Sequence, residues 1–506
     1  MTQTLSWRHA KCQARGHRRH RLTSHLSSAF FVSATVWSLS FAPHANAAIL
    51  QAGSGKAYNS PCSAIAAARS GDVIEVDSGG RWIDDFCTIS TPDLTLRSVG
   101  AGRAKVSASG TLELGPHQAI WAINAPGVTI EGFELYGARA SKAIRVLPGF
   151  GVVIRNSFLH DNDVGVEVAD GTSAEVLIER SEFSSNGNTI DIGHVARFTM
   201  RASYLHNGEG GALVLTRAAE NYLLSNRITQ EKGASPREID VPGGGRTYLI
   251  GNLVQHGANS QDAVMVAYGR NGPQNPSNEL YLVNNTLVNE QTEGSFVRLN
   301  SRVAPFAVIR NNIFCGNGTV DAAGASIANN FAGDPDFVDR EGFDYRLRPT
   351  SPAINTGGDP GVGAGYPLTP VEQYLHPMGE EVRISNSVID IGAYEYGGGT
   401  GKWDAAGQPV LALKPQQPAA APRTPLAGDG GTLSLASGTV VAGSSLTLNL
   451  SLTSVGPQPS GLQWTLTYPA GDVLSVQVAA GAAATAASKS VSCGTAAGST
   501  TCICSA

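Results

Sequence analysis

Charged side chains recur at one position of a repeated pattern in the middle of the chain. Along the chain, this position holds Arg145, Glu167, Asp191, Val214, Asp240, Met265 and Arg298, of which Val214 and Met265 are apolar. Each follows one apolar residue and precedes another, so on an extended strand it points to the opposite side from both. Carboxylates on neighbouring strands repel one another unless a cation or an arginine lies between them. The row therefore predicts either a Ca²⁺ or arginine-bridged cluster of Glu167, Asp191 and Asp240, or a solvated strand face whose side chains splay apart.

A further group of candidate catalytic residues lies in residues 206–246 and 266–272, which include the stretches IDVPGGG and VAYGRNG. These stretches resemble a pattern in exported bacterial proteins of the polysaccharide-lyase-like class, with Arg217, Asp240 and Tyr268 at matching positions. The resemblance implies that Arg217 and Asp240 are catalytic and that Tyr268 binds substrate. The chain departs from the pattern at Ala212 and at 215–216, where that class has His and Lys. From the residues alone, IDVPGGG is equally typical of a strand end followed by a glycine-rich turn.

One histidine is a candidate for acid–base chemistry. His194 lies just past Ile192 and is expected to reach the charged row beside Asp191, whereas His160, His206 and His256 occupy equivalent polar turn positions of the repeat. We also expect Glu238, Arg145 and Arg298 to contact substrate. No His-x-x-x-His pair or cysteine pair has zinc-ligand spacing, and the sequence has neither a Gly-x-Ser-x-Gly elbow nor a phosphate loop.

Three functions are compatible with these residues. A polysaccharide lyase needs a group that neutralises the substrate carboxylate and a base that removes the neighbouring ring proton. A glycoside hydrolase needs two carboxylates about 5–9.5 Å apart, for which Asp191, Asp240 and Glu238 are candidates. The third function is non-catalytic glycan binding at the cell surface.

The expected partner is an acidic polysaccharide, and the expected oligomeric state is a monomer. With a net charge of −5, 15% charged residues and no basic tract, the sequence gives no support for binding to nucleic acid or to anionic membranes.

A repeat in the sequence indicates which secondary-structure elements position these residues. A polar residue, one free position and a large apolar residue recur every 22–33 residues, at Asn156, Ser181, Ser203, Asn226, Asn252, Asn285 and Asn312. Short alternating runs of β-branched residues flank each copy, such as Val152 and Ile154 before it and Val166 and Val168 after it. A repeat of this length made of strands predicts a stacked array, namely an all-β, right-handed parallel β-helix. Asn156, Asn226, Asn252, Asn285 and Asn312 are predicted to stack at one corner, about 4.8 Å apart per coil.

The N-terminal sequence indicates export. Residues 1–47 combine a basic leader, the apolar stretch Phe30–Ala42 and the small residues Ala45 and Ala47. This pattern is typical of a signal peptide, and the apolar stretch is too short to span a membrane. The protein is therefore expected to be secreted or held at the cell surface. A helix near 63–70 is predicted to cap the first coil of a β-helix that runs over 48–350.

The cysteines agree with export. Cys62 and Cys87 flank the predicted cap helix and the first strand and are expected to form a disulfide. Cys493 and Cys502 could close a loop near the C-terminus, Cys315 is expected to be buried, and Cys504 has no assigned partner.

The C-terminal third carries a second resemblance. The stretches DPDFVD (334–339), YRLRPTSPAIN (345–355) and DIGAYEY (390–396) resemble the closing module of secreted bacterial β-helix proteins often called choice-of-anchor. The resemblance implies that residues 351–396 cap the solenoid. Residues 397–430 have the composition of a Pro/Gly/Ala linker, and 431–506 resemble part of a cohesin-like or Ig-like β-sandwich.

Overall fold

The structure is a computed structural model that describes residues 47–109, 119–300, 306–385 and 388–397. Beyond residue 400 it describes the backbone of short strands and Val478. Residues 1–46, which hold nearly all of the predicted signal peptide, lie outside the described part. The chain divides into two units, 1–400 and 401–506.

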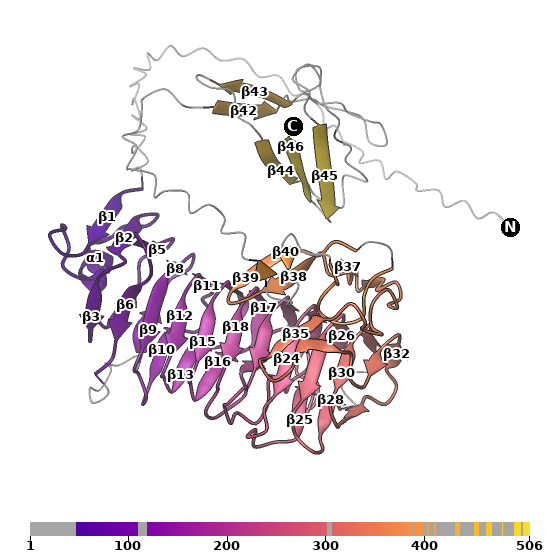
Figure 1. Cartoon of the computed structure of the whole chain (residues 1–506). Helices are drawn as coiled ribbons and strands as arrows, with labels where there is room; N and C mark the ends of the chain where they lie inside the picture. Colours follow the sequence, from indigo (N-terminus) through magenta and orange to yellow (C-terminus); the bar gives the residue numbers. More distant parts are fainter. Residues whose placement is uncertain are drawn as a thin grey trace, which may run out of the picture. The chain divides into compact units, whose positions relative to one another are not determined.

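Three long parallel sheets make up most of the first unit (Figure 1). The twelve-stranded sheet contains β1 (Ile49–Ala52), β2 (Val73–Asp77), β5 (Thr95–Val99), β8 (Thr129–Glu131), β11 (Val152–Arg155), β14 (Gly171–Glu179), β17 (Val195–Arg201), β20 (Glu220–Leu224), β23 (Arg246–Ile250), β26 (Glu279–Val283), β29 (Phe306–Arg310) and β32 (Ser326–Ala328). The eleven-stranded sheet contains β3 (Arg81–Ile83), β6 (Ala104–Ser107), β9 (Phe133–Tyr136), β12 (Phe158–His160), β15 (Glu182–Ser184), β18 (Tyr204–His206), β21 (Arg227–Thr229), β24 (Leu253–His256), β27 (Thr286–Asn289), β30 (Ile313–Cys315) and β33 (Phe331–Ala332). The ten-stranded sheet contains β4 (Cys87–Ile89), β7 (Ala119–Ile123), β10 (Lys142–Val146), β13 (Val164–Val168), β16 (Asn188–Ile192), β19 (Val214–Thr216), β22 (Ile239–Val241), β25 (Val264–Tyr268), β28 (Ser295–Leu299) and β31 (Thr319–Asp321).

The order of strands shows a parallel β-helix, as the repeat predicted. Each full coil gives one strand to each sheet, and every strand pairs in parallel with its equivalent in the next coil. The core consists of columns of apolar side chains along the axis, for example Ile130, Ile154 and Ile178 in paired positions of β8, β11 and β14, all fully buried. The eleven-stranded sheet was not recognised in the sequence, because most of its strands have only three or four residues and a single inward side chain.

An asparagine ladder stabilises the corner between the twelve-stranded and eleven-stranded sheets. The side-chain amide of Asn226 donates to Asn252 Oδ1, that of Asn252 to Asn285 Oδ1, and that of Asn285 to Asn312 Oδ1, each at 3.0 Å. The ladder ends at Asn330, 2.9 Å from the Asn312 amide. The prediction is therefore confirmed for these four asparagines.

Asn156 is not part of this ladder, and the prediction for it was wrong. It lies one position earlier, where the backbone has φ +50°, a left-handed conformation that Asn tolerates. Ser157 occupies the ladder position, and its N–H donates to Ser181 Oγ at 3.3 Å. The shift by one residue was not visible because Phe158 and Leu159 are both apolar.

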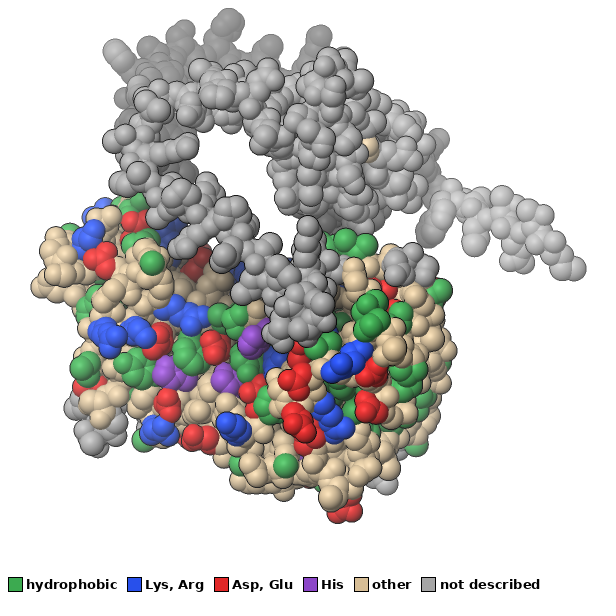
Figure 2. Space-filling view, viewed as in Figure 1, with side chains coloured by type: hydrophobic (Ala, Val, Ile, Leu, Met, Phe, Trp, Pro, Cys, Tyr) green, Lys and Arg blue, Asp and Glu red, His purple; other side chains and the backbone are tan. Residues whose placement is uncertain are grey.

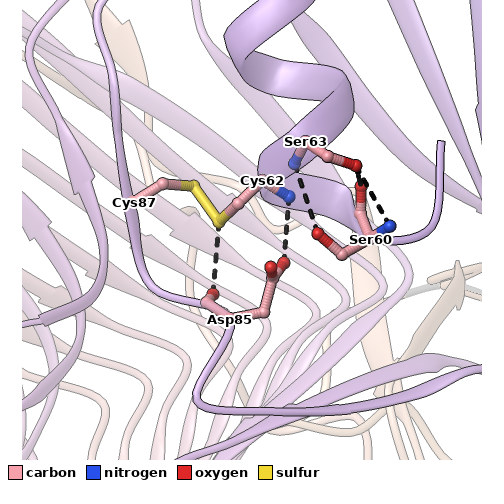
Figure 3. Close-up of a disulfide and its surroundings, with 5 residues drawn as sticks. All are labelled: Ser60, Cys62, Ser63, Asp85 and Cys87. Carbon is pink, nitrogen blue, oxygen red and sulfur yellow. Dashed lines mark hydrogen bonds between the residues drawn. A yellow bond between two sulfur atoms is a disulfide. The ribbon is translucent and has the colours of Figure 1, made fainter.

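A short helix covers the first coil. Helix α1 (Pro61–Ala67) begins after Ser60, whose hydroxyl accepts from the Ser63 N–H while the Ser63 hydroxyl lies 3.1 Å from the Ser60 N–H. Ala64 and Ile65 are buried in the apolar core. Cys62 and Cys87 form the predicted disulfide with a Cα–Cα distance of 5.8 Å, and Asp85 accepts the Cys62 N–H at 2.9 Å (Figure 3).

Removal of this disulfide by Cys62→Ala and Cys87→Ala is expected to lower the free energy of unfolding by about 3 kcal/mol. The bond closes a loop of 25 residues, and such a cross-link restricts the unfolded chain. Denaturant unfolding with and without reductant measures the effect: reductant should destabilise the natural protein and leave the double variant unchanged. Cys315→Ala is the control, because Cys315 is a buried free thiol, and it should keep the sensitivity to reductant.

The parallel strands end at β33, earlier than the predicted boundary at residue 350, and antiparallel hairpins follow. These hairpins are β34 (Phe337–Asp339) with β35 (Asp344–Leu347), β36 (Val362–Gly363) with β37 (Tyr366–Pro367), and β38 (Glu372–Leu375) with β39 (Gly379–Val382). Tyr248 donates to Gly363 O at 3.1 Å, Ser225 donates to Glu372 O at 3.0 Å, and Arg103 contacts Met378. These contacts reach back over many coils, so residues 334–385 and 388–397 pack along the side of the β-helix (Figure 1). We call residues 334–397 the return segment.

The second unit contains short antiparallel strands. They are β40 (Lys402–Trp403) with β41 (Pro409–Val410), β42 (Gly431–Leu435) with β43 (Leu450–Ser454), and a sheet of β44 (Leu462–Thr467), β46 (Ser499–Ser505) and β45 (Ser490–Ala496). The register of β45 and β46 sets Cys493 opposite Cys502; the disulfide between them stays a prediction. Within the described residues, no helix is long and apolar enough to cross a membrane.

Candidate functional site

The outer face of the ten-stranded sheet carries the charged row. The register aligns, from coil to coil, Ala122, Arg145, Glu167, Asp191, Leu215, Asp240, Ala267, Arg298 and Asp321. The sequence therefore located the charged members of the row up to Arg298, missed Asp321, and placed Val214 and Met265 in the row wrongly. Both are buried. Because β19 and β25 contain runs of consecutive apolar residues, alternation could not determine which of them face outward.

Every carboxylate of this row pairs with a cation. Glu167 lies 3.0 Å from Arg145 Nε and 3.6 Å from Lys142 Nζ. Asp191 accepts from Arg217 Nη1 at 2.8 Å, and Asp321 lies 3.5 Å from Arg298 Nε. These pairs offset the repulsion between acids on adjacent coils. Each of the three acids pairs with cations of its own, and no arginine in these pairs joins two of Glu167, Asp191 and Asp240.

The same residues do not fit a calcium ion. Asp240 lies 2.9 Å from Arg270 and 3.6 Å from Arg237, so its oxygens already face two guanidinium groups. A coil that presents Leu215 separates Asp240 from Asp191. In the described part of the chain, no three His, Cys, Asp or Glu side chains lie together as a metal-binding group. Glu167, Asp191 and Asp240 therefore do not form the oxygen cage that Ca²⁺ requires.

Four polar side chains gather where three consecutive strands of this sheet end, and we call them the His194 cluster: Asp170, Asp191, His194 and Arg217. Asp170 follows β13, His194 follows β16 and Arg217 follows β19. Asp170 Oδ1 accepts the His194 backbone N–H at 2.7 Å and lies 3.1 Å from His194 Nδ1. These hydrogen bonds, with a smaller contribution from the nearby Arg217 charge, lower the pKa of the Asp170 carboxyl. The cluster thus presents an imidazole held by a carboxylate, next to a guanidinium group.

Three of the predicted site residues are not accessible. Asp240 is only 2% exposed beneath Arg270, which excludes it as a base that contacts substrate. Tyr268 points into the core, is 1% exposed, and donates to Gly245 O at 2.7 Å. Glu238 has no exposed side chain. Their positions in the sequence were compatible with the surface, but the alternation of the strand turns Tyr268 inward, and Glu238 packs against His256 of β24.

Glu238 forms a buried pair with His256. His256 Nδ1 lies 3.0 Å from both Glu238 oxygens, and its Nε2 lies 2.7 Å from the carbonyl oxygen of Asp262. Burial raises the pKa of Glu238 to about 7, and the facing carboxylate raises the pKa of His256 against the opposing effect of burial. The pair needs a shared proton, because without it a buried carboxylate would face the lone pair of Nδ1. It is a structural pair beneath the surface.

The free energy of unfolding is expected to fall as the pH rises from 4.5, the ordinary glutamate value, through about 7. The pKa values of Glu238 and His256 are higher in the folded state than in the unfolded state, so the folded state binds more protons over this range. The free energy of unfolding then falls by up to about 1.4 kcal/mol per pH unit for each extra proton bound. Denaturant unfolding at a series of pH values measures it. Glu238→Gln keeps a hydrogen-bonding partner for His256 but does not titrate, so its curve should be flatter. Equal slopes in both proteins would contradict the assignment.

The comparison with protein families agrees with the fold. Residues 142–334 match the family model described as right handed beta helix region. These residues form a right-handed parallel β-helix. No curated protein matches the chain.

Solved structures resemble this β-helix at low sequence identity. The crystal structure of pectate lyase Pel9A is 15% identical, with a TM-score of 0.49, and the match covers 69% of this chain and 96% of that one. Crystal structures of the pectin methylesterase from Aspergillus niger in its deglycosylated and its penultimately deglycosylated form are 12% identical, with TM-scores of 0.28 and 0.27, and the matches cover 56% of this chain. The matches cover 85% and 84% of those two chains.

Several residues of the charged face were not recognised in the sequence. Lys142, Asp170, Arg237 and Arg270 lie outside the repeated position, in the turns or at strand ends. Arg270 belongs to the stretch VAYGRNG, and its charge next to Tyr268 was a signal that could have indicated a partner for Asp240. The other three have no local pattern that distinguishes them from ordinary turn residues.

Proposed function

We propose that the chain is an exported protein that binds an acidic polysaccharide along the outer face of the ten-stranded sheet and cleaves it by β-elimination at the His194 cluster. The observation that carries this proposal is the Asp170–His194 pair beside Arg217. A lyase requires a base and a group that neutralises the substrate carboxylate at neighbouring places. Arg145 and Arg298 extend the row of cations along the same face, with side chains 30% and 55% exposed. The basic leader and the disulfide support export.

In the proposed reaction, the Arg217 guanidinium pairs with the carboxylate of a uronate unit. This pairing stabilises the negative charge that develops when the proton on the adjacent ring carbon is removed. His194 takes this proton at Nε2 while Asp170 holds Nδ1. The electrons of the C–H bond form a carbon–carbon double bond, the bond to the glycosidic oxygen breaks, and that oxygen takes a proton from water. The products are an unsaturated uronate end and a new hydroxyl end.

Incubation of the full chain with polygalacturonate and with alginate tests this function. Cleavage is expected to produce ultraviolet absorbance from the new double bond, with shorter fragments on a sizing column. Absence of cleavage and of binding with both polymers would overturn the proposal.

A second candidate, binding without cleavage, has one observation in its favour. Asp191, Glu167 and Asp321 are all engaged by arginines, which is what a stable surface lattice of ion pairs would require. Polymer binding in an affinity gel without unsaturated products would favour this function. A glycoside hydrolase is less well supported, because it needs an accessible protonated carboxyl. Glu238 has a raised pKa but is fully buried, and Asp191 is ion-paired.

A further inference from the structure

A second polar site lies at the corner between the twelve-stranded and eleven-stranded sheets, away from the outer face of the ten-stranded sheet. An open hollow of about 680 Å³ at this corner is lined by ten residues, which include Arg103, Lys105, Glu131, Glu134 and Asn156. We call it the corner hollow. Its volume is within the range of small-molecule binding sites.

The return segment contacts one lining residue of this site, Arg103. The Arg103 Nε donates to the Asn156 carbonyl oxygen at 3.0 Å, and its Nη2 lies 3.3 Å from Met378 Sδ in the turn between β38 and β39. The Arg103 side chain is 22% exposed, so it is held in place with part of its surface free. Met378 therefore helps to fix the position of Arg103 at the edge of the corner hollow.

The charges that line the hollow balance one another. Lys105 Nζ lies 2.5 Å from Glu134 Oε2, and Asn156 Nδ2 donates to Glu131 Oε1 at 3.1 Å. The two cations and two carboxylates of the lining leave the hollow with no net charge that would attract an ion. Hydroxyl groups can instead use the remaining lone pairs of the carboxylates and the remaining N–H groups. The lining thus favours a neutral ligand rich in hydroxyl groups.

Aromatic rings adjoin the hollow on the outer face of the eleven-stranded sheet. The Arg103 guanidinium lies 5.6 Å from the Phe158 ring centre, and the His160 ring stacks on Phe158 at 4.2 Å and on Tyr136 at 4.9 Å. Glu134, which lines the hollow, lies 3.5 Å from His160 Nε2. Figure 2 shows acidic, basic and histidine side chains gathered with apolar ones over β9, β12, β15 and β18. Partly exposed rings beside paired carboxylates offer both an apolar and a hydrogen-bonding contact.

We propose that the corner hollow and the adjoining rings bind a neutral oligosaccharide of pyranose units. Its hydroxyl groups would hydrogen-bond to Glu134, Glu131 and Lys105, and the apolar C–H side of a sugar ring would pack on Phe158. This site goes beyond the proposed cleavage of acidic polymer, since it lies on another face and takes uncharged sugar.

Isothermal titration calorimetry of the full chain tests the inference with neutral oligosaccharides of glucose, galactose, mannose and xylose and with galacturonate oligomers. At least one neutral oligosaccharide is expected to bind, and Glu134→Gln and Phe158→Ala should each weaken it at least about tenfold. Glu134→Gln keeps the size of the side chain, so a loss of binding would not reflect a failure to fold. Glu175→Gln is the matched control on the twelve-stranded sheet, where Glu175 is an exposed partner of Arg197, and it should bind as the natural protein does.

A variant at the His194 cluster distinguishes neutral-sugar binding from the proposed cleavage of acidic polymer. Arg217→Ala should retain neutral-sugar binding even if it loses activity on polyuronate. Lack of binding by every neutral oligosaccharide, or unchanged binding in both Glu134→Gln and Phe158→Ala, would overturn the inference. Binding of galacturonate alone that depends on Glu134 would overturn the neutral chemistry proposed for this site.

Discussion

Replacement of Arg217 by Ala is expected to reduce kcat/KM on a polyuronate by about 100- to 1,000-fold. In the proposed reaction this guanidinium stabilises the charge that develops on the substrate carboxylate, and the loss of one such group typically has an effect of this size. Asp191, its partner, has a 28% exposed side chain and can be solvated after the substitution. The fold should therefore be retained, as measured by circular dichroism and thermal unfolding.

Two further variants separate chemistry from binding. Arg217→Lys keeps the charge but loses the planar fork, so it should recover part of the activity. His194→Gln should lower kcat, because it removes the proposed base. Arg197→Ala is the matched control, because Arg197 is an ion-paired arginine on a different sheet. If Arg217→Ala and Arg197→Ala had equal activity on the polymer, Arg217 would not be the neutralising group.

Replacement of Arg383 by Met is expected to lower the free energy of unfolding of the first unit by about 3–5 kcal/mol. Arg383 is buried, with a 1% exposed side chain. It donates to Glu395 Oε2 and to the carbonyl oxygens of Gly392 and Asp390, each at 3.0 Å. Its removal leaves the Glu395 carboxylate and two carbonyl groups buried without this donor, and the breaking of a buried pair has a cost of this size. Because these residues belong to the return segment, the segment should detach first.

Limited proteolysis and denaturant unfolding measure this effect. The double variant Arg383→Met, Glu395→Leu should be closer in stability to the natural protein than the single variant, since it removes both charges. Arg348→Met is the control: Arg348 is also in the return segment, but its side chain is 53% exposed. If Arg383→Met were no more sensitive to protease than Arg348→Met, the return segment would not depend on this buried cluster.

The coil architecture could be predicted from the sequence because it depends on local pattern. Alternating β-branched residues such as Val152 and Ile154 produce strands, and their recurrence forces a stack in which each coil buries its apolar side on the next. The asparagines at Asn226, Asn252, Asn285 and Asn312 indicated the corner that they occupy, since polar residues that recur at the spacing of the coils can hydrogen-bond to their equivalents and to the backbone of the preceding coil. The Cys62–Cys87 bond was also predictable, although Cys62 lies within helix α1 and not before it, and two strands separate the cysteines.

The residues on the outer face of the ten-stranded sheet were predictable only where apolar and charged residues alternate strictly along a strand. Arg145, Glu167 and Asp191 each stand between two apolar residues, and all three face outward as expected. In β19 and β25 the apolar residues are consecutive, and packing against the neighbouring coils, not the local pattern, decides that Val214 is buried and Leu215 faces outward. The partners of the acids were not predictable, because Arg270 and Arg237 reach Asp240 from turns whose course depends on the whole stack.

What the sequence alone determined is the stacked β-helix, its disulfide-linked cap and the side of the coil that carries the row of charge. Those features rest on periodicity and on contacts between adjacent coils. Only the tertiary structure decided that Glu238, Asp240 and Tyr268 are buried, that Asp170 holds His194, and that the return segment lies along the coils and contacts Arg103. These features depend on irregular loops and on residues far apart in the chain, whose positions are set by long-range packing and leave no periodic signal in the sequence.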